Sequence, residues 1–167
     1  MRKVIGIGET ILDIIFKNEQ PTAAKPGGST FNSMITLGRL GVNTEFISEV
    51  GRDRLGKQIK DFLAENNVKS ENVYDYDGGK TALSLAFLDE NMNADYLFYK
   101  NDAAQKLDYV MPKIEENDII VIGSFFSIND ALRENLTYLL DEAKRKKAII
   151  YYDVNFRKNR KSQVRFL

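Results

Sequence analysis

The sequence predicts an α/β fold in which a mostly parallel sheet is flanked by helices and a small antiparallel sheet is attached. Two observations predict the parallel sheet. Strand-like and helix-like patterns alternate along the chain, and residues 119–122 are continuously apolar, as in strands covered on both faces. The third observation is the alternation in residues 81–88, which places Leu83, Leu85 and Phe87 on one face. That period of two is typical of an antiparallel sheet with one face more exposed.

The individual elements follow from apolar spacing and from turn residues. The expected strands cover residues 4–8, 11–16, 45–50, 73–76, 81–88, 96–100 and 119–122, with a buried final strand at 148–153. The expected helices cover residues 31–41, 55–67 and 130–147, the first of them ending at Gly41, a residue type suited to a helix C-terminus. Residues 21–28 are expected to form a loop, and the strands between residues 73 and 100 to form the small sheet.

Composition restricts the chemistry and the partners of the chain. Its 167 residues carry 24 basic and 24 acidic side chains, so nothing in the net charge favours nucleic acid or an anionic membrane as a partner. No apolar run approaches the ~20 residues that span a bilayer, and we expect a soluble, cytoplasmic protein. Cysteine and histidine are absent, so any chemistry must use carboxylates, lysine, arginine, tyrosine or hydroxyl groups.

The run from Gly6 to Ile11 begins like a dinucleotide-binding fingerprint. The third glycine is missing, Glu9 would place a negative charge beside a pyrophosphate, and no helix follows, so we reject a dinucleotide site. Glu9 and Asp13 instead follow the first strand, at the edge where ligands gather in open α/β sheets. A carboxylate that accepts hydrogen bonds from sugar hydroxyls and a solvated turn carboxylate both remain open interpretations of this position.

The dipeptide Gly27-Gly28 precedes a predicted helix start. A diglycine permits positive φ and close approach of another group, and Ser29, Thr30 and Asn32 place short polar side chains where the first helical N–H groups are unpaired. Such a corner can hold a polyhydroxy ligand or an anion. An ordinary loop-to-helix turn would show the same residues.

Several longer motifs favour the interpretation of this corner as a binding site over an ordinary turn. GETILD, GGSTFN, LGRLG, SEVGRDRLG, TALSLAFLD, YLFYKNDAA and DVNFR occur in this order along the chain. Together they resemble the PfkB (ribokinase-like) carbohydrate kinases, most closely the fructokinase and 2-keto-3-deoxygluconate kinase branch. The resemblance implies that residues 1–167 are the N-terminal part of one ribokinase-like domain. It also implies lid segments at about 12–20 and 73–100, followed by an irregular tail at 158–167.

The resemblance implies an activity, since members of the family transfer the γ-phosphoryl group of ATP, with Mg²⁺, onto a sugar hydroxyl. By position, Asp13 would accept hydrogen bonds from the sugar, Gly27 and Gly28 would leave room for it, and Asn32 would donate to and accept from another hydroxyl. The implied partners are therefore a small sugar, ATP and Mg²⁺.

Three further positions carry implied roles. Lys100 stands where this branch often has arginine and would bind the substrate, although without the bidentate fork of a guanidinium. Arg157 would lie near the substrate or the transferring phosphate, and Asn155 near the phosphate and the metal. For Lys100 and Arg157 a solvated surface cation is the alternative. Asp53 is expected to cap a turn before the helix at Leu55 rather than to take part in chemistry.

The family's catalytic Asp and ATP-binding segment lie in a later G-A-G-D-type region that nothing in this chain matches. We therefore expect no catalytic residue and no metal ligand here, a largely absent nucleotide site, and no activity of the chain alone, with the C-terminal half of the fold absent. A non-catalytic sugar-binding or oligomerising fragment and a nucleoside kinase of the same superfamily are the alternatives. A homodimer through the lid or through the exposed edge of strand 148–153 is also expected.

Overall fold

The computed structural model describes residues 2–100, 106–123 and 125–155. Its main sheet has six strands in the order β10-β9-β1-β4-β5, with β6 pairing with the end of β4, and every pairing is parallel. These strands are β1 (Val4–Ile7), β4 (Thr44–Gly51), β5 (Val68–Lys69), β6 (Val73–Tyr76), β9 (Ile119–Gly123) and β10 (Ile149–Asp153). The predicted parallel sheet is confirmed.

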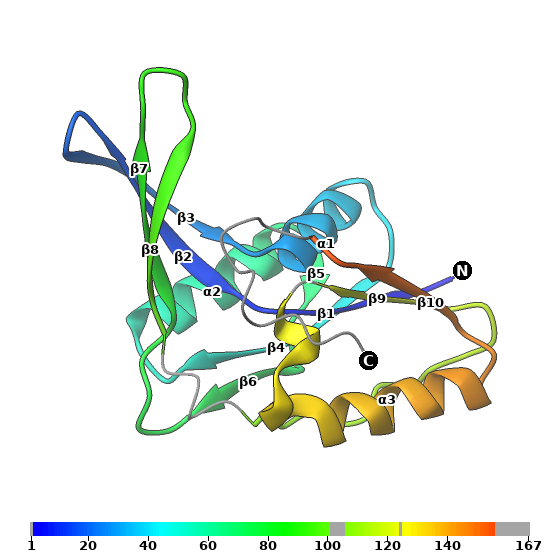
Figure 1. Ribbon diagram of the computed structural model, residues 1–167. Coiled ribbons are helices and arrows are strands. Elements are labelled where there is room, and N and C mark those ends of the chain that lie inside the picture. Colours follow the sequence, from blue (N-terminus) through cyan, green and yellow to red (C-terminus); the bar gives the residue numbers. More distant parts are fainter. Residues whose placement is uncertain (1, 101–105, 124, 156–167) are drawn as a thin grey trace.

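Helices cover both faces of this sheet (Figure 1), as the alternating pattern predicts. Helices α1 (Ser29–Arg39) and α2 (Arg54–Glu65) pack on one face around the fully buried Phe31 and Phe46. Helix α3 (Arg133–Arg145), preceded by short 3-10 turns η2 (Phe125–Ile128) and η3 (Asp130–Leu132), packs on the other face through Leu136 and Leu139. None of the helices in the described ranges is long and apolar enough to cross a membrane.

A second, four-stranded sheet projects from one side of the main sheet, in the order β3-β2-β7-β8 (Figure 1). Its strands are β2 (Ile11–Lys17), β3 (Gln20–Gly27), β7 (Leu83–Leu88) and β8 (Ala94–Tyr99). The outer pairs are antiparallel, but β2 and β7 pair in parallel, so the predicted antiparallel sheet is a mixed one. The long connection between β2 and β7, through α1 and α2, is what allows the parallel pairing.

Two local expectations about the small sheet are wrong. Residues 21–28 were expected as a loop but form most of β3, because an edge strand tolerates Pro21 and Pro26 where one row of N–H groups has no strand partner. Residues 73–76 were expected in the small sheet but form β6 against β4 in the main sheet. The buried Val73 and Tyr76 explain this placement, because the main sheet offers the larger apolar contact.

The two faces of the small sheet differ as the alternation predicts. Ser84 and Ala86 on β7 are buried, whereas Leu83, Leu85 and Phe87 are half-buried on the opposite face. Phe87 stacks on Phe16 of β2, with 4.7 Å between ring centroids. The larger apolar side chains therefore lie on the more exposed face.

The final strand, β10, lies at the edge of the main sheet. Ile149 and Tyr151 are 46% and 58% exposed, while Ile150 packs against the α3 side. The prediction of a buried final strand is therefore wrong, and the prediction of an exposed apolar edge is confirmed. In the described part of the chain β10 has a strand partner on one side only, which explains its exposure.

Candidate functional site

The candidate site lies where the chain passes from the carboxyl end of β1 into the small sheet. Gly28 caps the N-terminus of α1 with φ of +130°, and a Cβ at this position would lie 2.2 Å from the carbonyl oxygen of Glu9. A Cβ on Gly8 would lie 2.7 Å from Cβ of Thr30. The start of α1 is thus held against the end of β1 by contacts that only glycine permits, and its first N–H groups point to the carboxyl edge of the sheet.

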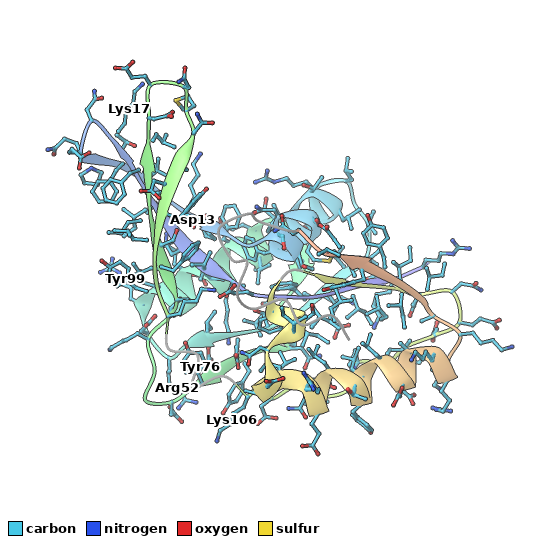
Figure 2. The ribbon with its side chains drawn as sticks, in the orientation of Figure 1. Asp13, Lys17, Arg52, Tyr76, Tyr99 and Lys106 are labelled. Carbon is cyan, nitrogen blue, oxygen red and sulfur yellow. The ribbon has the colours of Figure 1, made fainter. Side chains whose placement is uncertain are left out.

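Asp13 lies on β2, between the body of the molecule and Lys17 near the tip of the small sheet (Figure 2). Ser84 donates from Oγ to Oδ1 of Asp13 at 2.5 Å, and a Cβ on Gly27 would lie 2.5 Å from Oδ2. The hydrogen bond from Ser84 and the absence of a side chain at Gly27 therefore position the carboxylate between β3 and β7. The sequence placed Asp13 and Gly27 in the site but did not identify Ser84.

Lys100, directly after β8, forms an ion pair with Glu9, which follows β1 by two residues. The two side chains are only 15% and 23% exposed, and Nζ of Lys100 lies 5.4 Å from the ring centroid of Phe98. This pair joins residues 91 positions apart and ties the small sheet to the main sheet. Glu9 and Lys100 were each identified from the sequence, but their contact was not.

Glu49, on β4, is a site residue that the sequence reasoning missed. It is 5% exposed, and its Oε2 accepts hydrogen bonds from the backbone N–H groups of Lys106 (3.1 Å) and Leu107 (3.0 Å). Its buried Oε1 has no hydrogen-bond partner within the described residues. Burial raises the pKa of Glu49, the two amide hydrogen bonds oppose this, and the nearby Glu9 carboxylate raises it further. A lone acid within the apolar run FISEVG is the signal that could have identified it.

Asp53 was expected to cap a turn before α2, and it caps the N-terminus of α2 itself. Its Oδ1 accepts from the N–H groups of Leu55 (3.0 Å) and Gly56 (2.9 Å) and from the hydroxyl of Thr81, and its Oδ2 accepts from the N–H of Thr81. Partial burial raises the pKa of Asp53, but the hydrogen bonds from Gly56, Thr81 and Leu55 together lower it below the ordinary value of 3.8. This carboxylate connects the start of α2 to the strand that enters the small sheet.

The remaining predicted site residues are Asn32, Asn155 and Arg157. Asn32 lies exposed in the first turn of α1. Asn155 follows β10 at the same carboxyl edge as Glu9, and its N–H donates to Oδ1 of Asp153 at 3.0 Å. Arg157 lies outside the described residues. The contacts therefore bring together Glu9, Asp13 and Lys100 around the Gly27-Gly28 dipeptide, and Asn155 lies on the neighbouring part of the sheet edge.

The described residues contain no group of three or more carboxylates that could hold a metal ion. The corner contains hydrogen-bond acceptors, a partly buried ammonium group and the N-terminus of α1. This combination is suited to binding a polyhydroxy ligand.

A parallel α/β sheet with a polar corner at its carboxyl edge, beside a small mixed sheet, defines a ribokinase-like fold. The chain belongs to the pfkB family of carbohydrate kinases, because the model of that family matches residues 1–166. Among similar proteins, probable fructokinase-6 of Arabidopsis thaliana is 28% identical over 167 residues, covering 92% of this chain and 43% of the relative. Probable fructokinase-3 of the same plant is 26% identical over 92% of this chain and 48% of the relative.

Solved structures show the same fold. Fructokinase from Xylella fastidiosa is 26% identical, with a TM-score of 0.74 over 94% of this chain and 53% of that one. A double mutant of fructokinase from Vibrio cholerae, bound to fructose, ADP and potassium, is 20% identical with a TM-score of 0.80 over 95% of this chain and 52% of that one. The chain thus spans about half the length of the curated relatives and solved structures it matches.

Proposed function

We propose that this chain supplies the sugar-binding half of an ATP-dependent sugar kinase of the fructokinase type. The observation that supports this most is the convergence of Asp13, Gly27 and Gly28 on one corner, where Ser84, 71 residues from Asp13 along the chain, holds the Asp13 carboxylate in place. The similarity to fructokinases over 92% of the chain points to the same substrate class.

In this proposal different residues of the corner bind different hydroxyl groups of the sugar. Asp13, oriented by Ser84, accepts hydrogen bonds from two neighbouring sugar hydroxyls. The absence of side chains at Gly27 and Gly28 lets the Asp13 carboxylate and the Glu9 backbone approach the start of α1 closely. Asn32 donates to and accepts from a further hydroxyl. Holding the hydroxyl in a fixed place is the chain's contribution to phosphoryl transfer, which depends largely on positioning.

The transfer step needs a proton acceptor near the attacking hydroxyl and donors that stabilise charge on the moving phosphoryl group. The family resemblance assigns both to a segment that this chain does not match. It assigns only Asn155 and Arg157 to the vicinity of the phosphate. We therefore propose that the 167-residue chain binds sugar but does not consume ATP at a measurable rate.

A second candidate function is a non-catalytic fragment that self-associates. It is favoured by the apolar side chains that β8 and β10 expose, among them Leu97 (49%), Tyr99 (56%) and Tyr151 (58%). Figure 2 places Tyr99 on the small sheet, in the part of the molecule away from α3. Exposed apolar side chains on an edge strand are a common basis for pairing between chains, so we propose a homodimer through the small sheet or through β10.

The proposal is tested by measuring ATP consumption with Mg²⁺, and sugar binding by calorimetry, on a panel of fructose, 2-keto-3-deoxygluconate and a nucleoside. We expect fructose binding that is lost in Asp13→Ala, and no ATP consumption. The matched control is Asp95→Ala, which removes an exposed carboxylate from the opposite face of the same sheet. Turnover would contradict the proposed inactivity, nucleoside binding would favour a nucleoside kinase, and sugar binding unaffected by Asp13→Ala would refute the proposed site.

A further inference from the structure

The ion pair between Lys100 and Glu9 has properties beyond those of a surface salt bridge. Both side chains are mostly buried, and the ammonium group also lies over the ring of Phe98. A partly buried ammonium that loses its carboxylate keeps much of the desolvation cost and none of the compensation. Separating Lys100 from Glu9 is therefore unfavourable unless another anion takes the place of Glu9.

The groups around this pair are mainly acceptors. Asp13 presents a carboxylate on the side of Gly27, and Glu49 lies near Glu9 with a buried oxygen that no described residue satisfies. The nearest additional cation by strand register is Lys25, opposite Asp13, and it is exposed to solvent. Among the residues that the structure describes, the corner thus has one mostly buried positive charge, and Glu9 already pairs with it.

We infer that Glu9 is a specificity-determining residue, which keeps Lys100 neutralised so that the corner accepts uncharged polyhydroxy sugars and rejects sugars that carry a carboxylate. This inference rests on the proposed function and specifies the substrate class of the same site. A ligand carboxylate could use Lys100 only by displacing Glu9, and Glu9 would then remain mostly buried beside another negative charge. A lysine also lacks the fork that lets an arginine serve two carboxylates at once.

The test compares two ligands that differ only at one end. Gluconate and sorbitol share a six-carbon chain and its hydroxyl groups, but gluconate ends in a carboxylate. We expect the wild-type chain to bind sorbitol more tightly than gluconate in calorimetry at low salt. Glu9→Gln, which keeps the shape but removes the charge, is expected to shift the ratio of the two affinities toward gluconate by roughly tenfold or more, the size expected when a desolvated charge pair is opened.

The chain provides a well-matched control. Lys3 and Glu45 form an ion pair at 3.0 Å with 14% and 13% exposure, beside the amino ends of β1 and β4 and therefore at the other edge of the sheet. Glu45→Gln should affect stability but leave the affinity ratio unchanged. In the double variant Glu9→Gln/Lys100→Met, the gain in gluconate binding should disappear, because the released ammonium group is no longer present.

The outcomes separate this inference from the proposed function. Fructose binding by the wild-type chain with an unchanged ratio in a folded Glu9→Gln variant would overturn the inference and leave the proposed function standing. A wild-type chain that binds no sugar, with a Glu9→Gln variant that gains gluconate, would contradict the proposed function and support the role of Glu9. If no variant binds any of the ligands, both are contradicted. Circular dichroism of each variant shows whether it is folded.

Discussion

Replacing Asp53 with alanine removes a single carboxylate on which α2 and the entry to the small sheet both depend. Loss of the N-cap hydrogen bonds to Leu55 and Gly56 costs about 1 kcal/mol. Thr81, which is 3% exposed, loses two hydrogen bonds to a charged acceptor. These add about 2 kcal/mol, which is less than the usual ~1.5–3 kcal/mol for each hydrogen bond to a charged group, because Asp53 is only half-buried and Thr81 Oγ1 keeps Gly51 as a partner. The free energy of unfolding should therefore fall by about 3 kcal/mol, a large share of a typical domain stability.

Urea denaturation followed by far-UV circular dichroism measures this loss. Asp61→Ala is the control, since its carboxylate is 53% exposed on the same helix and forms a surface ion pair with Lys57, so it should cost at most about 0.5 kcal/mol. The pKa of Asp53 is lowered in the folded state, so its stabilisation is present above the ordinary value of 3.8 and is lost as the pH falls through the lowered value. A loss below about 0.5 kcal/mol in Asp53→Ala, or one that is the same at pH 6 and pH 3, would refute the reasoning.

Two further predictions concern the corner itself. Gly28→Ala places a Cβ 2.2 Å from the carbonyl oxygen of Glu9 at a φ of +130°, so we expect a loss of about 2–4 kcal/mol in urea denaturation. Gly41→Ala, at a φ of +77° with no atom within 4 Å of the new Cβ, should cost only about 1 kcal/mol; equal losses would contradict the importance of the contact. Glu49→Gln keeps an acceptor for the N–H of Leu107 without burying a charge, so stability at pH 7 should be unchanged or higher, whereas Glu49→Ala should lower it. Because the folded pKa of Glu49 is raised, wild-type stability should decline as the pH rises from the ordinary value of 4.5 through the raised value, and Glu49→Gln should reduce this decline. A Glu49→Gln variant as unstable as Glu49→Ala would show that the charge itself is needed.

Local features of the molecule were predictable because their causes lie within a few residues. The cap at Asp53 needs only N–H groups two and three positions later, and the positive φ at Gly41 follows from its place just past the end of α1. The helices α1, α2 and α3 follow from apolar side chains spaced three and four apart. Motif order then carried the family assignment, which the match over residues 1–166 confirms.

Other features depended on which strands become neighbours. The edge strand β3 was missed because its two prolines predict a loop, and only its place at the edge of the small sheet makes them acceptable. The parallel pairing of β2 with β7 joins segments about 70 residues apart, so nothing local encodes it. The alternation in residues 81–88 indicated two faces, but only the packing decides that the small side chains lie on the buried one.

The sequence by itself determined the fold class, the family and most of the residues in the corner, because periodicity, glycine positions and motif spacing are read along the chain. The tertiary structure decided that Glu9 pairs with Lys100, that Ser84 orients Asp13, and that β10 ends the main sheet with an exposed edge. The physical reason is the range of the interactions. Dihedral preferences and helix caps act over one turn, whereas charge pairing and burial depend on distances that are fixed only when separate strands are brought side by side.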